Sequence, residues 1–137
     1  MRLNKGGSTL SKHIGKIVQV IGPVVDVMFE SQELPELMNA VEIPLENEAP
    51  LIVEVAQHIG DDRVRCVAMG STDGLKRGMK AIDSEAPISV PVGKEVLGRM
   101  FNVLGRSIDG LKELTKTPRM PIHRSAPTFD EQQTSAE

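Results

Sequence analysis

Residues 14–83 form a succession of short segments rich in Val and Ile, separated by turn residues. The first run, GKIVQVIGPVVDVMF, is interrupted at Gly22-Pro23, and Asp73-Gly74 marks a later turn. Short strands with regular turn signals and no strong helical period are typical of a small closed β-barrel. The sequence therefore predicts a mainly β fold for this part of the chain.

Alternation predicts which side chains of the first run face the core. Val25, Val27 and Phe29 fall on one face of a strand, and Asp26 falls on the other, which we expect to be partly exposed. Because proline cannot donate a ladder hydrogen bond, Gly22-Pro23 is interpreted as a bulge or bend between two strand halves.

A hairpin is predicted over residues 51–69. Its arms are residues 51–59 and 63–69, joined by a turn at Gly60-Asp61-Asp62. In the second arm Val64, Cys66 and Ala68 point one way, whereas Arg63 and Arg65 point the other and form the exposed face. Further short strands are predicted at residues 40–43 and 79–82.

The sequence changes character at about residue 84. Residues 84–91 contain two prolines and predict an extended linker, followed by a helical turn at 94–97 and a strand at 100–104. From residue 113 the apolar residues thin out, which predicts a mobile tail unless a partner covers it. The predicted domains are a disordered leader at 1–13, the barrel at 14–83, and an incomplete, partly disordered second domain at 84–137.

Composition limits the partners that the chain can bind. The 137 residues carry a formal net charge of −3 and include three Phe but no Trp or Tyr, which disfavours nucleic acid as the main partner. The single cysteine, Cys66, excludes an internal disulfide and is interpreted as a small buried hydrophobic residue. No apolar run approaches the roughly 20 residues that cross a bilayer.

Phosphate binding is the first chemistry to test, because Gly93-Lys94 resembles the end of a phosphate-binding loop. Such a loop needs a glycine five residues earlier and a Ser or Thr after the lysine. Ile88 and Glu95 occupy those positions, and Glu95 would repel a phosphate. Gly15-Lys16 fails as well, since Ile17 follows it. Gly93-Lys94 is therefore interpreted as a turn that leads into a helix.

The sequence evidence for a metal site or an acid–base site is equally weak. His13, His58 and His123 lie far apart in the sequence, and His58 is expected to be a solvated side chain at a hairpin tip. A zinc site from His58 and Cys66 would still lack two ligands. Asp61-Asp62 is interpreted as turn chemistry. No catalytic, cofactor-binding or metal-binding residue is predicted.

Four phrases together resemble one known family. GKIVQVIGPVVDVMF, EVAQHIGDDRVRCVAMGSTDGLKRG, APISVPVGKEVLGRMFNVLGRSIDG and PIHRSAPTFDEQ occur in this order. Together they are similar to the N-terminal part of the catalytic β subunit of a bacterial F-type ATP synthase. The resemblance runs from about Ile14 to the end of the chain, although KELTKTPRM matches only loosely.

The resemblance implies a six-stranded barrel that precedes a nucleotide-binding α/β domain. In this family the barrels of alternating α and β subunits form a ring that holds the hexamer together, peripheral to the cytoplasmic face of the bacterial inner membrane. The intact subunit takes ATP or ADP with Mg²⁺. Its phosphate loop and catalytic residues follow the PIHR phrase, so none maps onto this chain, and the chain alone is expected to have no enzymatic activity.

Three further expectations remain open. The alternative function is a stand-alone barrel of the oligonucleotide-binding type, which needs a basic groove and stacking aromatic residues. The predicted strand at residues 100–104 has no partner in the chain, so it is expected to pair with another copy. Contact with a membrane is expected only through the intact complex.

Overall fold

The computed structural model describes residues 13–133. The chain divides after Ile88 into two units, which are treated separately below. The predicted leader at residues 1–13 lies almost wholly outside the described residues, as do the last four residues of the predicted tail. Among the described residues, no helix is long and apolar enough to cross a membrane.

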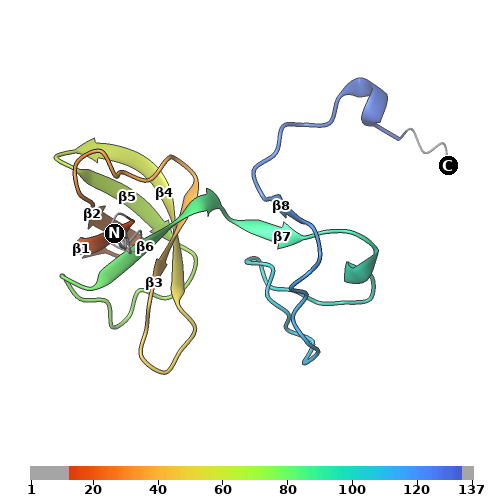
Figure 1. Cartoon of the computed structure of the whole chain (residues 1–137), viewed down its shortest axis with the longest axis horizontal. Helices are drawn as coiled ribbons and strands as arrows, with labels where there is room; N and C mark the ends of the chain where they lie inside the picture. The colour runs from red at the N-terminus through yellow and green to blue at the C-terminus, as the bar shows by residue number, and fades with distance from the viewer. Residues whose placement is uncertain (1–12, 134–137) are drawn as a thin grey trace, which may run out of the picture. The chain divides into compact units, whose positions relative to one another are not determined.

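Six antiparallel strands of the first unit close into a barrel (Figure 1). Around the barrel the order is β1-β2-β5-β4-β3-β6, and β6 pairs with β1 to complete the ring. The predicted mainly β fold with a small closed barrel is therefore confirmed. The strands are β1 (Ile14–Ile21), β2 (Val24–Met28), β3 (Asn39–Ile43), β4 (Leu51–Gly60), β5 (Arg63–Ala68) and β6 (Lys80–Pro87).

The core fills the inside of this barrel with aliphatic side chains from every strand. Val25, Val27 and Phe29 point inward from β2 and its end, as the alternation predicts. A single glycine makes room for the only aromatic ring in the core, because a Cβ at Gly15 would lie 2.9 Å from Phe29 and 2.6 Å from the Met28 carbonyl oxygen. The other core residues are Ile17, Val41, Ile43, Leu51, Val53, Val55, Val64, Cys66 and Ala81.

The interpretation of Gly22-Pro23 as a bulge or bend is wrong. These two residues form a hairpin turn that reverses the chain, since Ile21 on β1 pairs with Val24 on β2. Gly22 has a positive φ of 54°, and glycine is the residue that adopts this conformation without strain at the first position of a two-residue turn. A bulge does exist in β1, but it lies earlier, between Ile17 and Gln19.

The predicted hairpin at residues 51–69 is present as β4 and β5. Asp61 and Asp62 form its two-residue turn, with φ values of 51° and 59°. Two successive positive φ values are the requirement of a type I′ turn, which Asp tolerates better than most residues. The adjacent acids are therefore explained by backbone geometry.

The predicted linker at residues 84–91 is strand instead. Strand β6 continues to Pro87, where it pairs with Asn39 of β3, four residues past the boundary expected at residue 83. After Ile88 the chain enters β7 (Ser89–Pro91), which pairs with β8 (Arg119–Pro121) in a separate two-stranded sheet. The backbone is extended as predicted, but distant segments provide hydrogen-bond partners that the local sequence does not reveal.

The second unit otherwise consists of turns. The predicted helical turn is present as the 3-10 helix η1 (Lys94–Val96), and a second, η2 (Phe129–Glu131), lies near the end of the described chain. The predicted strand at residues 100–104 is wrong, since only Phe101 forms a β-bridge, to Ser107. The Asn102 side chain instead accepts hydrogen bonds from the amides of Leu104 and Arg106, and these bonds fold the segment into a turn.

Candidate interaction surface

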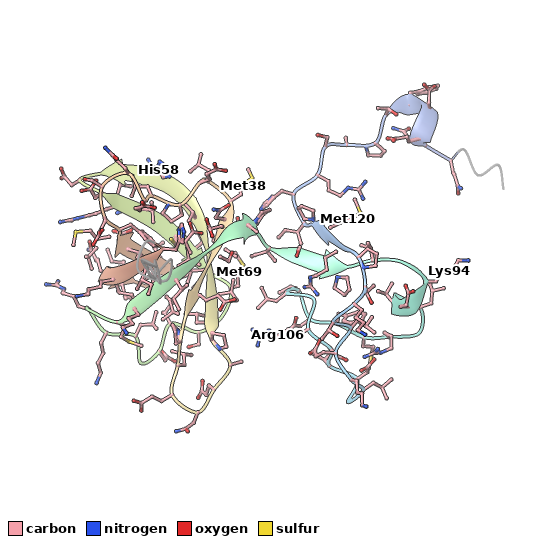
Figure 2. The ribbon with its side chains drawn as sticks, in the orientation of Figure 1. Met38, His58, Met69, Lys94, Arg106 and Met120 are labelled. Carbon is pink, nitrogen blue, oxygen red and sulfur yellow. The ribbon has the colours of Figure 1, made fainter. Side chains whose placement is uncertain are left out.

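The two Gly-Lys pairs occupy ordinary structural positions. Gly93 precedes η1 with a φ of 112°, and Lys94 is exposed on that helix (Figure 2). The Glu95 carboxylate lies 3.0 Å from the place that a Cβ on Gly93 would occupy, so a negative charge faces this turn. Gly15 is buried against Phe29 on β1. Gly93-Lys94 is therefore the turn into a helix that the sequence predicts, and Gly15-Lys16 is part of strand β1.

The candidate metal ligands remain apart. His13 Nε2 lies 3.4 Å from Glu85 Oε1, while His58 Nε2 lies 2.7 Å from the carbonyl oxygen of Pro35. His58 is exposed on β4 as expected (Figure 2), yet this contact ties it to the loop between β2 and β3. Within residues 13–133, no three His, Cys, Asp or Glu side chains gather as they would around a metal ion.

Cys66 is a core residue, as the sequence indicates. Its side chain is fully buried among the aliphatic residues of the barrel. Burial raises the pKa of the thiol to about 12, because the thiolate would lose its hydration. Only the thiolate is strongly nucleophilic, so this cysteine has neither the access nor the charge state of a reactive group.

The outer face of three neighbouring strands combines apolar and basic side chains, and we call it the basic face. Its upper row is apolar, because Ile21 of β1 pairs with Val24 of β2, which pairs with Val67 of β5. In a lower row Met28 lies between Lys16 and Arg63. The basic face comprises the outward side chains of β1, β2 and β5, namely Lys16, Gln19, Ile21, Val24, Asp26, Met28, Arg63, Arg65 and Val67.

An ion pair lies at the centre of the basic face. Arg65 Nε donates to Asp26 Oδ1 at 2.9 Å and Arg65 Nη2 donates to Oδ2 at 3.0 Å, an aligned bidentate pair. Hydrogen bonding to the Asp26 carboxylate raises the pKa of Arg65. The Asp26 side chain is 4% exposed and that of Arg65 is 43% exposed.

This pair corrects two sequence expectations. Asp26 is buried, not partly exposed, because the Arg65 side chain lies against it. Arg65 is only partly a surface residue, whereas Arg63 is exposed as predicted. Strand alternation places Asp26 and Arg65 on outward faces. Predicting their contact also requires knowing that β2 and β5 are neighbours, although the two residues are 39 positions apart in the sequence.

On the opposite side of the barrel the outward side chains of β3, β4 and β6 include Glu42 and Glu54 and also the exposed Lys80, and we call this side the acidic face. Glu42 of β3 points outward between Ile52 of β4 and Ile82 of β6, its partners on either side. Glu54 of β4 pairs with Ala40 in the next outward row. Strands β2 and β3 are three places apart in a ring of six, so the basic and acidic faces lie on opposite sides.

The second unit is organised around another ion pair that the sequence did not reveal. Arg99 Nε donates to Asp109 Oδ2 at 2.6 Å, and Arg99 Nη2 donates to Ser107 Oγ and to the Lys112 carbonyl oxygen. The backbone amides of Met100 and Leu111 also donate to Asp109. The Arg99 hydrogen bond, with help from Ser107, holds the pKa of Asp109 well below its usual range.

We expect the loop held by Asp109 to resist acid. A carboxyl group whose pKa is lowered in the folded state stabilises that state above its unfolded pKa, which is about 3.9. This stabilisation declines only as pH falls below that value toward the lowered folded pKa. The Met100 and Leu111 amide signals in NMR spectra should therefore stay unchanged from neutral pH to about pH 4. In the Asp109→Asn variant both signals should differ from those of the wild type already at neutral pH, and they should no longer change as the pH is lowered. If the signals of the variant titrated as those of the wild type do, this role of Asp109 would be contradicted.

Many apolar side chains of the second unit are exposed. The exposed side chains are Leu97, Met100, Val103, Ile108, Leu111, Ile122 and Phe129.

Comparison with known families gives one match. Residues 17–85 match the model described as the ATP synthase alpha/beta family, beta-barrel domain. The match covers half of the chain, begins within β1 and ends within β6. The matched segment therefore coincides with the six strands that form the closed barrel.

Proposed function

The chain belongs to the ATP synthase alpha/beta family, and from this premise we propose that it is the barrel part of a catalytic β subunit from a bacterial F-type ATP synthase. Its role is to hold the subunit between neighbouring α subunits in the ring, peripheral to the cytoplasmic face of the inner membrane. The four phrases in their order support the β over the α subunit, whose first strand differs and which lacks the Pro-Ile-His-Arg phrase.

The observation that carries this proposal is the closed barrel with two different outer faces. Closure leaves few unpaired strand edges, so contacts to a neighbour must use the outward side chains. A subunit in a ring needs one surface for each neighbour, and these two surfaces differ. The basic face and the acidic face lie on opposite sides of the barrel, as such a role requires.

We propose that this chain alone neither binds nor hydrolyses nucleotide. ATP, ADP and Mg²⁺ belong to the intact subunit, because Gly93-Lys94 lacks the flanking residues of a phosphate loop and Glu95 adds a repelling charge. Saturable micromolar binding of ATP in calorimetry would contradict this part of the proposal.

The alternative, an oligonucleotide-binding barrel, has little support. Such barrels stack bases on exposed aromatic side chains. The only aromatic residue of the barrel strands and their ends is Phe29, which is 3% exposed in the core. Phe101 and Phe129 belong to the second unit.

The direct test is assembly with an α subunit. We expect the chain to co-elute in size-exclusion chromatography with the isolated α subunit of a bacterial F-type ATP synthase. The Lys16→Glu/Arg63→Glu variant reverses two exposed charges of the basic face. It should weaken the complex if that face contacts the α subunit. Failure to bind α subunit, together with salt-dependent binding of single-stranded DNA, would support the alternative instead.

A further inference from the structure

We propose that the Asp73-Gly74 turn, between β5 and β6, is a site of spontaneous modification at which aspartate rearranges to isoaspartate, while Asp109-Gly110 is protected from the same reaction. These two pairs are the only Asp-Gly pairs in the sequence. Both glycines are exposed and have positive φ values, 83° and 76°. The inference goes beyond the proposed function and does not depend on it, because it concerns the backbone chemistry of one loop.

The reaction needs no reagent other than water. The backbone nitrogen of Gly74 attacks Cγ of Asp73, the amide proton and the carboxyl hydroxyl leave together as water, and a cyclic succinimide forms. Water then adds to one of the two ring carbonyls. Opening at Cγ restores aspartate, whereas opening at the main-chain carbonyl carbon leaves the backbone running through Cβ and Cγ. The product is an isomer, and glycine favours its formation because it has no side chain to hinder the attack.

The Asp73-Gly74 pair is open to this reaction. Both residues are exposed, and among residues 13–133 no donor or cation holds the Asp73 carboxylate. The Gly74 amide likewise makes no hydrogen bond within this range, and a Cβ at Gly74 would meet nothing within 4 Å. The pair lines a cavity of about 580 Å³ that opens to solvent, so water can reach the ring.

Asp109 provides the contrast within the same chain, because its side chain is 9% exposed and held on both oxygens. The donors are Arg99 Nε and the Met100 amide to Oδ2, and Arg99 Nη2, Ser107 Oγ and the Leu111 amide to Oδ1. These bonds restrict the side-chain rotation that the attack requires. They also keep the carboxyl group ionised, since the Arg99 hydrogen bond lowers the pKa of Asp109, and a carboxylate has no hydroxyl to lose.

The rearrangement at Asp73 would alter a loop that is tied to the barrel on both sides. Thr72 Oγ1 donates to the carbonyl oxygen of Gly22 at 2.8 Å, and Leu75 packs partly buried against the core. The Leu75 amide closes the turn by donating to the Thr72 carbonyl oxygen at 3.2 Å. Isoaspartate adds one carbon to the backbone between these residues, so the Leu75 amide signal in NMR spectra should shift as the product accumulates.

Mass spectrometry of the aged full chain tests this inference. After long incubation in neutral buffer, electron-transfer fragmentation of peptides that span each pair distinguishes isoaspartate from aspartate. Methylation by an isoaspartate-specific carboxyl methyltransferase gives an independent measure of the product. Isoaspartate at Asp73 should exceed that at Asp109 by about tenfold or more, because each unit by which the pKa of Asp109 is lowered reduces its protonated fraction tenfold.

Three variants make the test specific. Asp73→Glu keeps the charge but would have to close a larger ring, so no isomer should form at that position. Arg99→Met removes two bonds from the Asp109 carboxylate and should raise isoaspartate at Asp109 towards the level at Asp73. Ser107→Ala removes one bond and should raise it less, a graded response that complete loss of the loop structure would not give.

Three outcomes would overturn the inference. They are a wild-type chain without isoaspartate at Asp73, a wild-type chain in which both pairs react at the same rate, and an Arg99→Met variant in which Asp109 remains as unreactive as in the wild type. Nucleotide and α-subunit binding do not enter these measurements, so the inference and the proposed function fail independently.

Discussion

Replacing Ile43 with alanine is expected to lower the free energy of unfolding of the barrel by about 2–5 kcal/mol. Ile43 is fully buried, and its side chain packs in the core that every strand shares. Its truncation removes apolar contacts and leaves a cavity that a closed ring of strands cannot easily collapse. Because domains of this size are stable by only about 5–15 kcal/mol, the loss is a large part of the total.

The matched control is Ile21→Ala, which removes the same atoms from a side chain that is 58% exposed. Its effect on stability should be within about 0.5 kcal/mol. Chemical denaturation measures both variants. The single cysteine offers a second readout, because buried Cys66 should react with a thiol reagent only when the barrel opens. Equal losses for the two variants would show that Ile43 does not lie in the core.

The parts of the fold that could be predicted are those that depend on neighbours along the chain. Alternation alone placed Val25, Val27 and Phe29 on one face of their strand, and Val64 and Cys66 on one face of theirs, and both faces line the core. The hairpin at Asp61-Asp62 was likewise a local signal, since two residues that tolerate positive φ lie between two strand-forming runs.

The parts that could not be predicted depend on which segments meet. Gly22-Pro23 fits both a bend and a hairpin turn, and only the pairing of β1 with β2 decides between them. The segment around Asn102 has strand-like composition, but one side-chain amide that caps its backbone groups changes its fold. The candidate surface could not be predicted for the same reason, because outward residues of different strands form one face only when the strand order places them together.

Removing Arg65 is expected to destabilise the barrel several-fold more than neutralising its partner Asp26. The reason is one-sided burial, since the Asp26 side chain is 4% exposed and that of Arg65 is 43% exposed. Arg65→Met would leave a carboxylate inside the protein without its bidentate partner, and an uncompensated buried charge is strongly unfavourable. Asp26→Asn leaves a guanidinium that can still reach water, and should cost about 1 kcal/mol, the contribution of an ordinary hydrogen bond.

Arg63→Met is the matched control for Arg65→Met, because Arg63 lies on the same strand and face, is exposed, and makes no ion pair with a described residue. It should leave the melting temperature nearly unchanged, whereas Arg65→Met should lower it by several degrees. The double variant Asp26→Asn/Arg65→Met should recover part of the loss, since no buried charge then remains. Calorimetric melting of the four variants measures this coupling. If Arg65→Met and Arg63→Met melted alike, the ion pair would contribute nothing to the barrel, and Asp26 would have to be stabilised by solvent instead.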